Sequence, residues 1–101
     1  MQEIILDFAG IQSPEALHDY LQAVFQLPGY YGRNLDALWD CLYCAFSQPT
    51  TIVLRRAAQL PADMAPTARG LLRLFDDLQR EDENVTVRID PEEKIVFRPS
   101  L

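Results

Sequence analysis

The sequence predicts an α/β fold in which a small parallel sheet packs against helices. The chain has 101 residues, which is the size of one ordinary domain. Of these residues 49% are apolar, enough for one compact hydrophobic core. Segments with strand character alternate with segments of helical periodicity along the chain. Strands separated by helices favour parallel pairing, because each crossover then covers a sheet face.

The first half of the chain is predicted to form one strand and two helices. The apolar segment 3–8 is rich in β-forming residues and predicts the strand. A first helix follows Ser13, a good N-cap, and ends at the Pro-Gly pair 28–29. Asn34 is the expected N-cap of a second helix, which we predict to run to about Ser47. The apolar stripes predicted to face the core are Leu17, Leu21, Val24 and Phe25 in the first helix and Leu35, Leu38, Leu42 and Phe46 in the second.

The second half alternates in the same way. Segment 51–55 is an apolar run of strand length, 67–81 has helical periodicity, and 84–90 predicts another strand. We assign residues 1–90 to a single domain and 91–101 to a C-terminal extension that forms a short strand or tail. The core stripe of the third helix comprises Leu71, Leu74, Phe75 and Leu78.

Charge is unevenly distributed along the chain. The protein carries 15 acidic and nine basic side chains, a net charge of −6. Residues 1–50 hold six acids and one base (−5), so the second half contributes only −1. An acidic surface argues against direct binding of nucleic acid, whose phosphates require clustered Lys and Arg, and favours a basic protein partner. The alternative is that the acidity only keeps the protein soluble.

Two further observations concern location. No apolar run approaches the roughly 18 residues that a membrane span needs. The first ten residues contain two acidic residues, Glu3 and Asp7, and they lack the basic n-region of a secretory signal. We therefore expect a cytoplasmic protein that has no membrane partner and is a monomer when free.

Segment 34–47 places carboxylates beside large aromatic side chains. On a helix, Asp36 and Asp40 share one face, with Trp39 and Tyr43 next to them. Like charges four residues apart destabilise a helix by roughly 0.2–0.5 kcal/mol. Asp40 also lies too far from the helix N-terminus to be stabilised by the dipole. Such a local conflict is typical of a functional site, the alternative being a solvated surface acid.

The loop before this helix contains Tyr30 and Tyr31, followed by Gly32. We expect one tyrosine to pack inside and the other to stand at the surface, where exposed aromatics beside charges are typical of binding sites. Gly32 is expected to allow a turn with positive φ.

The third helix carries a second group of acids. Asp77 and Glu81 are four residues apart, so they share a helix face. Arg73 can pair with Asp77, and Arg80 with Asp76, at the spacing of helical ion pairs. We interpret Asp76 as ordinary surface charge and leave Glu81 open.

The sequence offers little support for catalysis or metal binding. Cys41 and Cys44 form a C-x-x-C pair, but in mid-helix rather than at the helix N-terminus where the dipole stabilises a thiolate. We interpret them as buried helix thiols. His18 is placed on the polar side of the first helix without a partnered motif. We predict no enzyme activity, no metal site and no cofactor.

Residues 27–42, LPGYYGRNLDALWDCL, resemble the signature of the barstar family, intracellular inhibitors of small basic microbial ribonucleases. The resemblance extends more weakly over about residues 3–90, including the segment LFDDLQRE of the third helix. It implies a three-stranded parallel sheet packed against helices. It also implies that a loop and helix enter the ribonuclease active site, where carboxylates replace RNA phosphates. The partner would be a basic, barnase-like ribonuclease.

The resemblance carries over to individual residues. Tyr30, Asp36, Trp39 and Asp40 match binding positions in the motif, with Asp40 as the central anchor. Asp77 and Glu81 match the acidic positions on the later helix, although Asp77 is one methylene shorter than the family's usual Glu. The full predicted partner-binding set is Tyr30, Asn34, Asp36, Trp39, Asp40, Tyr43, Cys44, Asp77 and Glu81.

This chain departs from the family pattern at Tyr43 and Cys44, which are bulkier than the family's usual residues there, and at Arg33, which reverses a charge beside the loop. These departures concern the partner's identity. Three hypotheses follow: a ribonuclease inhibitor, an acidic module on the same scaffold that binds a basic protein other than a ribonuclease, and a thiol redox enzyme.

Overall fold

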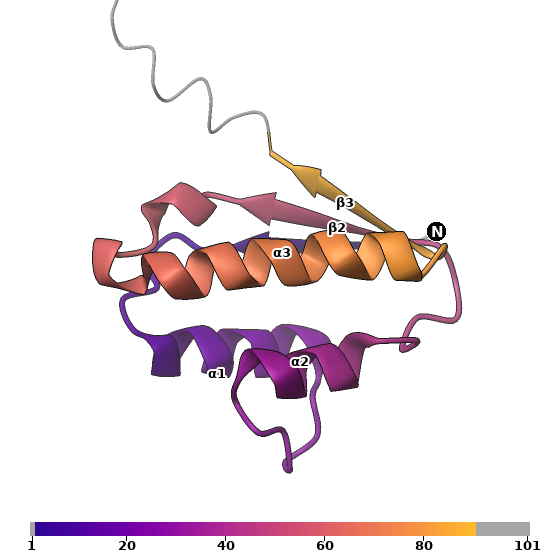
Figure 1. Ribbon diagram of the computed structural model, residues 1–101, viewed down its shortest axis with the longest axis horizontal. Coiled ribbons are helices and arrows are strands. Elements are labelled where there is room, and N and C mark those ends of the chain that lie inside the picture. Colours follow the sequence, from indigo (N-terminus) through magenta and orange to yellow (C-terminus); the bar gives the residue numbers. More distant parts are fainter. Residues whose placement is uncertain (1, 91–101) are drawn as a thin grey trace, which may run out of the picture.

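The computed structural model describes residues 2–90, which form three strands, three α-helices and two short 3-10 helices (Figure 1). The predicted extension 91–101 lies outside the described residues. In chain order the elements are β1 (Gln2–Asp7), α1 (Pro14–Phe25), α2 (Leu35–Leu42), β2 (Thr50–Arg55), η1 (Ala57–Gln59), η2 (Ala62–Met64), α3 (Ala65–Glu81) and β3 (Val85–Ile89).

The three strands form one parallel sheet in the order β1-β2-β3, which confirms the predicted fold class. The register aligns Ile4 with Ile52 and Ile52 with Val87. Because the central strand β2 is paired on both sides, five of its six residues are buried. It therefore reads as a continuous apolar run, whereas its neighbours alternate.

One face of the sheet is covered and the other is largely open. Leu6 and Val85 are buried, while the adjacent Ile5 and Thr86 point to the opposite face and are exposed. Consecutive strand order explains this arrangement, since crossovers of one hand that advance in one direction place their helices on the same face. The open face bears charged side chains in place of a second helical layer.

The helix starts follow the predicted caps. The Ala16 N–H donates to Ser13 Oγ at 3.1 Å, and the Ala37 N–H donates to Asn34 Oδ1 at 2.8 Å. These side chains satisfy backbone donors that the first turn of a helix leaves free. The position of Asn34 therefore has a structural explanation that does not require a partner.

Helices α2 and α3 pack closely beside each other. A Cβ built on Gly70 of α3 would lie 2.6 Å from Leu35 Cδ1 of α2, so the missing side chain permits this approach. Leu38 and Leu42 of α2 are buried, as are Leu71, Leu74, Phe75 and Leu78 of α3. The apolar stripes predicted for the two helices thus meet in the core, with Leu35 half-buried at its edge.

The predicted end of the second helix at Ser47 is wrong. Helix α2 stops at Leu42, Tyr43 is extended, and Cys44 has a left-handed backbone with φ 61°. The reason is tertiary: the chain must reverse so that Phe46 reaches the Phe25 ring, 6.5 Å away between centroids, before β2 begins. The Asn84 side chain donates to the Phe46 carbonyl at 2.9 Å and holds this return segment.

Candidate functional site

The solvent side of α2 carries two exposed carboxylates, those of Asp36 and Asp40. Within residues 2–90, neither Asp36 nor Asp40 makes a side-chain hydrogen bond or an ion pair. Asp36 lies in the first turn, where the helix dipole favours an anion. Because α2 ends at Leu42, Asp40 lies in its last turn, where the dipole disfavours one. The local cost of Asp40 is therefore greater than the sequence suggested.

Two aromatic side chains lie next to these acids. The Trp39 and Tyr43 rings stack with centroids 5.3 Å apart and planes 21° from parallel. Trp39 is half-buried against the core, whereas Tyr43 is 44% exposed. Stacking stabilises this arrangement of the two rings, and it leaves part of Tyr43 facing solvent.

Helix α3 contributes two more exposed acids that have no ion-pair partner among residues 2–90. Asp76 forms the predicted ion pair with Arg80 at 2.9 Å, in agreement with its interpretation as ordinary surface charge. The pair predicted between Arg73 and Asp77 is not formed in the described part of the chain. Asp77 and Glu81 both remain exposed without a hydrogen-bond or ion-pair partner there.

Tyr43 connects the acids of the two helices. Its phenol has a raised pKa, first because of the adjacent Cys44 and next because of Glu81, with smaller contributions from partial burial and Asp82. The packing of α2 against α3, and the hydrogen bond from Asn84 after α3 to the Phe46 carbonyl after α2, bring the C-terminal ends of the two helices together. We call the surface formed by Asp36, Trp39, Asp40, Tyr43, Asp77 and Glu81 the acidic–aromatic face.

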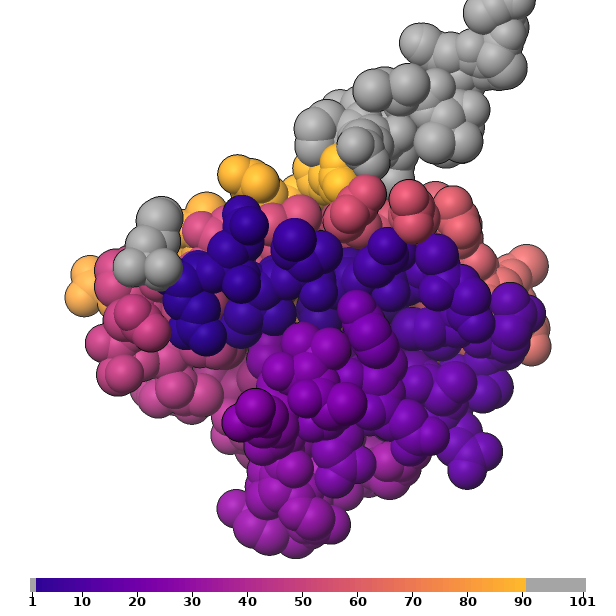
Figure 2. Space-filling view, turned by 180° about the vertical axis from the view of Figure 1, so that it is seen from behind, coloured from indigo at the N-terminus to yellow at the C-terminus, as the bar shows by residue number. Residues whose placement is uncertain are grey.

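The loop between α1 and α2 separates its two tyrosines as predicted. Tyr30 is 86% exposed, whereas Tyr31 is 5% exposed and belongs to the core. The space-filling view shows this part of the chain protruding below the body of the molecule (Figure 2). Tyr30 therefore stands on a projection that is contiguous in sequence with α2.

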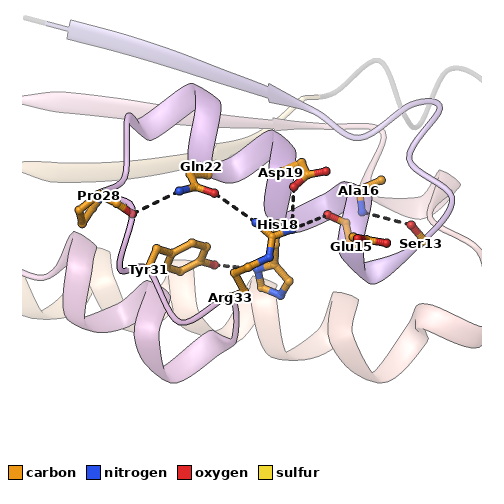
Figure 3. Close-up of polar contacts among 9 residues, drawn as sticks. All are labelled: Ser13, Glu15, Ala16, His18, Asp19, Gln22, Pro28, Tyr31 and Arg33. Atoms are coloured by element: carbon orange, nitrogen blue, oxygen red, sulfur yellow. Dashed lines mark hydrogen bonds and ion pairs between the residues drawn. The ribbon is translucent and has the colours of Figure 1, made fainter.

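Tyr31 contacts His18 in the interior, and the predicted position of His18 was wrong. His18 is buried rather than on the polar side of α1, and its Nδ1 lies 2.7 Å from the Tyr31 hydroxyl (Figure 3). Burial, and then the nearby Arg33 guanidinium, lower the pKa of His18, while Asp19 opposes them. Burial likewise raises the pKa of Tyr31. Helical periodicity relates residues within one helix, so it could not predict that His18 contacts Tyr31, 13 residues further along the chain.

Two backbone and side-chain predictions in this region are also wrong. The left-handed residue of the loop is Arg33, with φ 59°, and not Gly32. The helix thiols are not both buried: Cys41 is half-buried, and Cys44 is exposed beyond the end of α2. Both cysteines are free and lie at the C-terminal end of the helix, where the dipole opposes a thiolate. This placement argues against the redox hypothesis.

Other kinds of site are poorly represented. In the part of the chain that the structure describes, no three His, Cys, Asp or Glu side chains gather in a way that could hold a metal ion. None of the helices in that part is long and apolar enough to cross a membrane. An apolar pocket lies between η1, η2 and the start of α3, and it contains no residue of the predicted partner-binding set. The acids of the predicted site and Tyr43 are exposed at the surface, and Tyr30 is exposed on the projecting loop.

Comparison with known proteins decides the family. A family model described as Barstar (barnase inhibitor) matches residues 1–92. The chain belongs to the barstar family. It is similar to a Bacillus subtilis (strain 168) protein named "Putative ribonuclease inhibitor YrdF", with 38% identity over 81 residues, which cover 80% of this chain and 89% of the relative.

Within this barstar-family chain, the structure brings most of the predicted site residues together. The acidic–aromatic face joins α2 to α3, Cys44 adjoins Tyr43, and Asn34 ends the loop that carries Tyr30. That these nine residues bind a partner remains a prediction. Sequence reasoning did not predict that His18, Gln22 and Arg33 make the contacts that hold the loop. The one available signal was that Arg33 is the single base among residues 1–50.

Proposed function

We propose that this barstar-family protein inhibits a basic ribonuclease by covering its active site with the acidic–aromatic face and Tyr30. The observation that carries the proposal is a set of four exposed acids, which have no counter-ion among residues 2–90, beside a stacked and partly exposed aromatic pair. A ribonuclease must bind phosphates, and so it presents cationic side chains in its active site. Carboxylates at this face are suited to occupy the positions of those phosphates.

The comparisons support this proposal at the level of the partner's class. The family description names a barnase inhibitor, and the name of the Bacillus subtilis relative specifies a ribonuclease inhibitor. Both names describe inhibitors rather than enzymes. We therefore infer a protein–protein interaction with a barnase-like ribonuclease, in a one-to-one complex, with no catalytic step on the inhibitor.

In this proposal, both electrostatic attraction and apolar contact area contribute to binding. Unpaired acids create a negative potential that accelerates encounter with a basic protein. In the complex, carboxylates accept charge-assisted hydrogen bonds from Arg and Lys, which are about twice as strong as neutral ones. The rings of Tyr30, Trp39 and Tyr43 supply apolar contact area with few rotamers to order. Asp40 lies at the middle of this set, next in sequence to Trp39 and three residues before Tyr43.

The direct test is inhibition of RNA hydrolysis by barnase. Titrating the chain into barnase at low salt should abolish hydrolysis at one equivalent. Asp40→Ala should require a large excess to achieve the same inhibition. Asp63→Ala removes the same charge from an exposed position at the opposite end of α3. It is the matched control and should inhibit as the wild type does.

Failure of the wild-type chain to inhibit barnase at low salt and in excess would contradict the proposal. The acidic module with another basic partner would then become the better hypothesis. It predicts that the immobilised chain retains a basic protein without ribonuclease activity and that Asp40→Ala releases it. Equal inhibition by the wild type and by Asp40→Ala would show that a different surface is used.

A further inference from the structure

The loop 28–34 is fastened to α1 at several points (Figure 3). The amide of Gln22 serves both sides of the loop: its Nε2 donates to the Pro28 carbonyl at 3.2 Å, and its Oε1 accepts from Arg33 Nη1 at 3.1 Å. Between these points, the Tyr31 N–H donates to the Pro28 carbonyl at 3.0 Å. The fixed flanks leave Tyr30 exposed between them.

Arg33 makes the most contacts of any side chain in this arrangement. Besides Gln22, its Nη2 donates to the Glu15 carbonyl at 3.1 Å and forms an ion pair with Asp19 Oδ1 at 2.6 Å. The three acceptors are four and three residues apart along α1, so they lie on one helix face. A single planar guanidinium thus spans two turns of α1 from the far end of the loop.

The backbone at Arg33 shows that these contacts hold an unfavourable conformation. Its φ of 59° is left-handed, which crowds the Cβ of any residue except glycine. The residue lies immediately before the N-cap Asn34, so its conformation sets the angle at which the loop enters α2. Releasing the guanidinium would allow this residue to return to the favoured region and the loop to change its direction.

Because Arg33 is positively charged, its effect on the order of the loop can be distinguished from its electrostatic effect on a basic partner. It is the single base among residues 1–50, close to a face that is otherwise acidic. A free positive charge there would repel a basic partner, but Asp19 neutralises it. Removing Arg33 should therefore strengthen long-range attraction while loosening the loop, and the two effects on affinity have opposite signs.

We infer that Arg33 is a positioning residue that clamps the binding loop onto α1 and so presents Tyr30 in a preorganised state. The inference rests on the proposed function only for the partner, because the clamp itself is a property of the free protein. Preorganisation raises affinity by reducing the ordering that binding must impose. Asp19, Gln22 and the carbonyl of Glu15 form the receiving surface of the clamp.

Arg33→Lys tests the clamp at constant net charge. Lysine keeps the positive charge but offers a compact ammonium that cannot hold three acceptors in one plane. We expect barnase to bind this variant roughly 3- to 10-fold more weakly, the range associated with ordering one mobile side chain or loop segment. Arg33→Ala should also bind more weakly, despite its more negative charge. Arg69→Ala, which removes a charge from an exposed position on α3, is the control and should not weaken binding.

Hydrogen exchange in the free protein gives a second readout that needs no partner. The Tyr31 amide, which bonds to the Pro28 carbonyl, should exchange several-fold faster in both Arg33 variants, while amides of β2 keep wild-type protection. Asp40→Ala should weaken binding without changing exchange of the Tyr31 amide. This contrast separates loss of a contact from loss of loop order.

Three results would overturn the inference: unchanged exchange at Tyr31 in Arg33→Lys, wild-type affinity of that variant, or tighter binding by Arg33→Ala. The last result would mean that Arg33 acts through its charge alone. If the wild-type chain does not bind barnase, the proposed function fails. The clamp is then decided by the exchange measurement alone.

Discussion

The open face of the sheet and the acidic–aromatic face both carry acids, but only the first neutralises them. On the sheet side, Arg88 approaches Glu3 at 3.7 Å, Arg56 pairs with Asp7 at 3.0 Å, and Arg55 pairs with Asp90 at 2.6 Å. On the acidic–aromatic face, Asp36, Asp40, Asp77 and Glu81 have no such partner among residues 2–90. Four acids without such a partner therefore share one surface, although Glu15, Asp63 and Glu83 also lack an ion-pair partner within residues 2–90 and lie outside the acidic–aromatic face.

The difference distinguishes acids that serve the fold from acids that do not. Paired surface charges contribute only about 0–1 kcal/mol each, but they leave little net potential. Unpaired acids four residues apart repel each other and, at the end of a helix, oppose its dipole. Within residues 2–90, no ion pair or side-chain hydrogen bond offsets this cost at Asp40. The expected compensation is a cationic partner, and the following changes test that expectation.

The largest effect is expected from Asp40→Ala. Removing one member of an ion pair that becomes buried in a complex leaves the other charge unpaired, a loss of about 3–5 kcal/mol. The dissociation constant for barnase should rise by more than about 100-fold. Stability should not fall, because the side chain makes no hydrogen bond or ion pair with any of residues 2–90. Titration calorimetry measures the dissociation constant, and urea unfolding measures the stability. A loss of stability with unchanged affinity would show that Asp40 serves the fold and not the partner.

Tyr31→Phe tests the buried side of the loop. It removes the hydroxyl that lies 2.7 Å from His18 Nδ1 and leaves a buried polar atom without its partner. We expect the free energy of unfolding to fall by about 1–3 kcal/mol. Tyr30→Phe makes the same chemical change at an exposed position and should leave stability unchanged. Equal stability of the two variants would contradict the assignment of Tyr31 to the core and of Tyr30 to the surface.

Tyr30→Ala should show the opposite pattern to Tyr31→Phe. Because the side chain is 86% exposed, its removal should change the free energy of unfolding by less than about 0.5 kcal/mol. The lost aromatic contact should weaken barnase binding by about 10-fold. Surface plasmon resonance with immobilised barnase would measure the change, and an unaltered affinity would exclude Tyr30 from the interface.

The pH dependence of stability should report the buried His18. Its pKa is lowered in the folded protein by burial and by Arg33, so below its ordinary value of 6.5 the unfolded chain binds the proton more readily. The stabilisation is fully present above that value and is lost as the pH falls below it. His18→Gln should lack this part of the dependence. Parallel stability–pH curves for the two proteins would contradict the assignment.

The smallest effect is expected from single acids of α3. Asp77→Asn removes an unpaired charge and should slow association with barnase by less than about threefold, an effect that salt screening should diminish. Asp76→Asn removes a charge that Arg80 already neutralises, at the adjacent position. It should have less effect on the association rate. Stopped-flow fluorescence would measure the association rates of the two variants. A larger effect of Asp76→Asn would contradict the claim that acids without an ion-pair partner contribute more to the attraction.

Local sequence rules predicted much of the fold. The strand at 51–55, the caps Ser13 and Asn34, and the apolar stripe of α3 depend on neighbouring residues, so pattern and propensity were sufficient. The end of α2 was not predictable in this way, because it depends on the return of Phe46 to Phe25 across the core. A helix end set by such a distant contact leaves no sequence signal at the end itself.

In the candidate site, too, features that depend on neighbouring residues were predicted and features that depend on distant contacts were not. The face of Asp36 and Asp40 follows from helical spacing, and the motif around them carried the family resemblance. The contacts that orient the loop did not follow, because His18 to Tyr31 and Asp19 to Arg33 span 13 and 14 residues between a helix and a loop. Side chains that bind can be recognised by type and spacing. Side chains that position them require the tertiary structure.

The most direct measurement is the rate of association with barnase as a function of ionic strength, for the wild type and for a variant with Asp36→Asn, Asp40→Asn, Asp77→Asn and Glu81→Gln together. If the unpaired acids create the surface that a basic ribonuclease meets, the wild-type rate should fall steeply with salt. The variant should associate slowly and with little dependence on salt. Equal rates and equal salt dependence would contradict a role for these four carboxylates in meeting the partner.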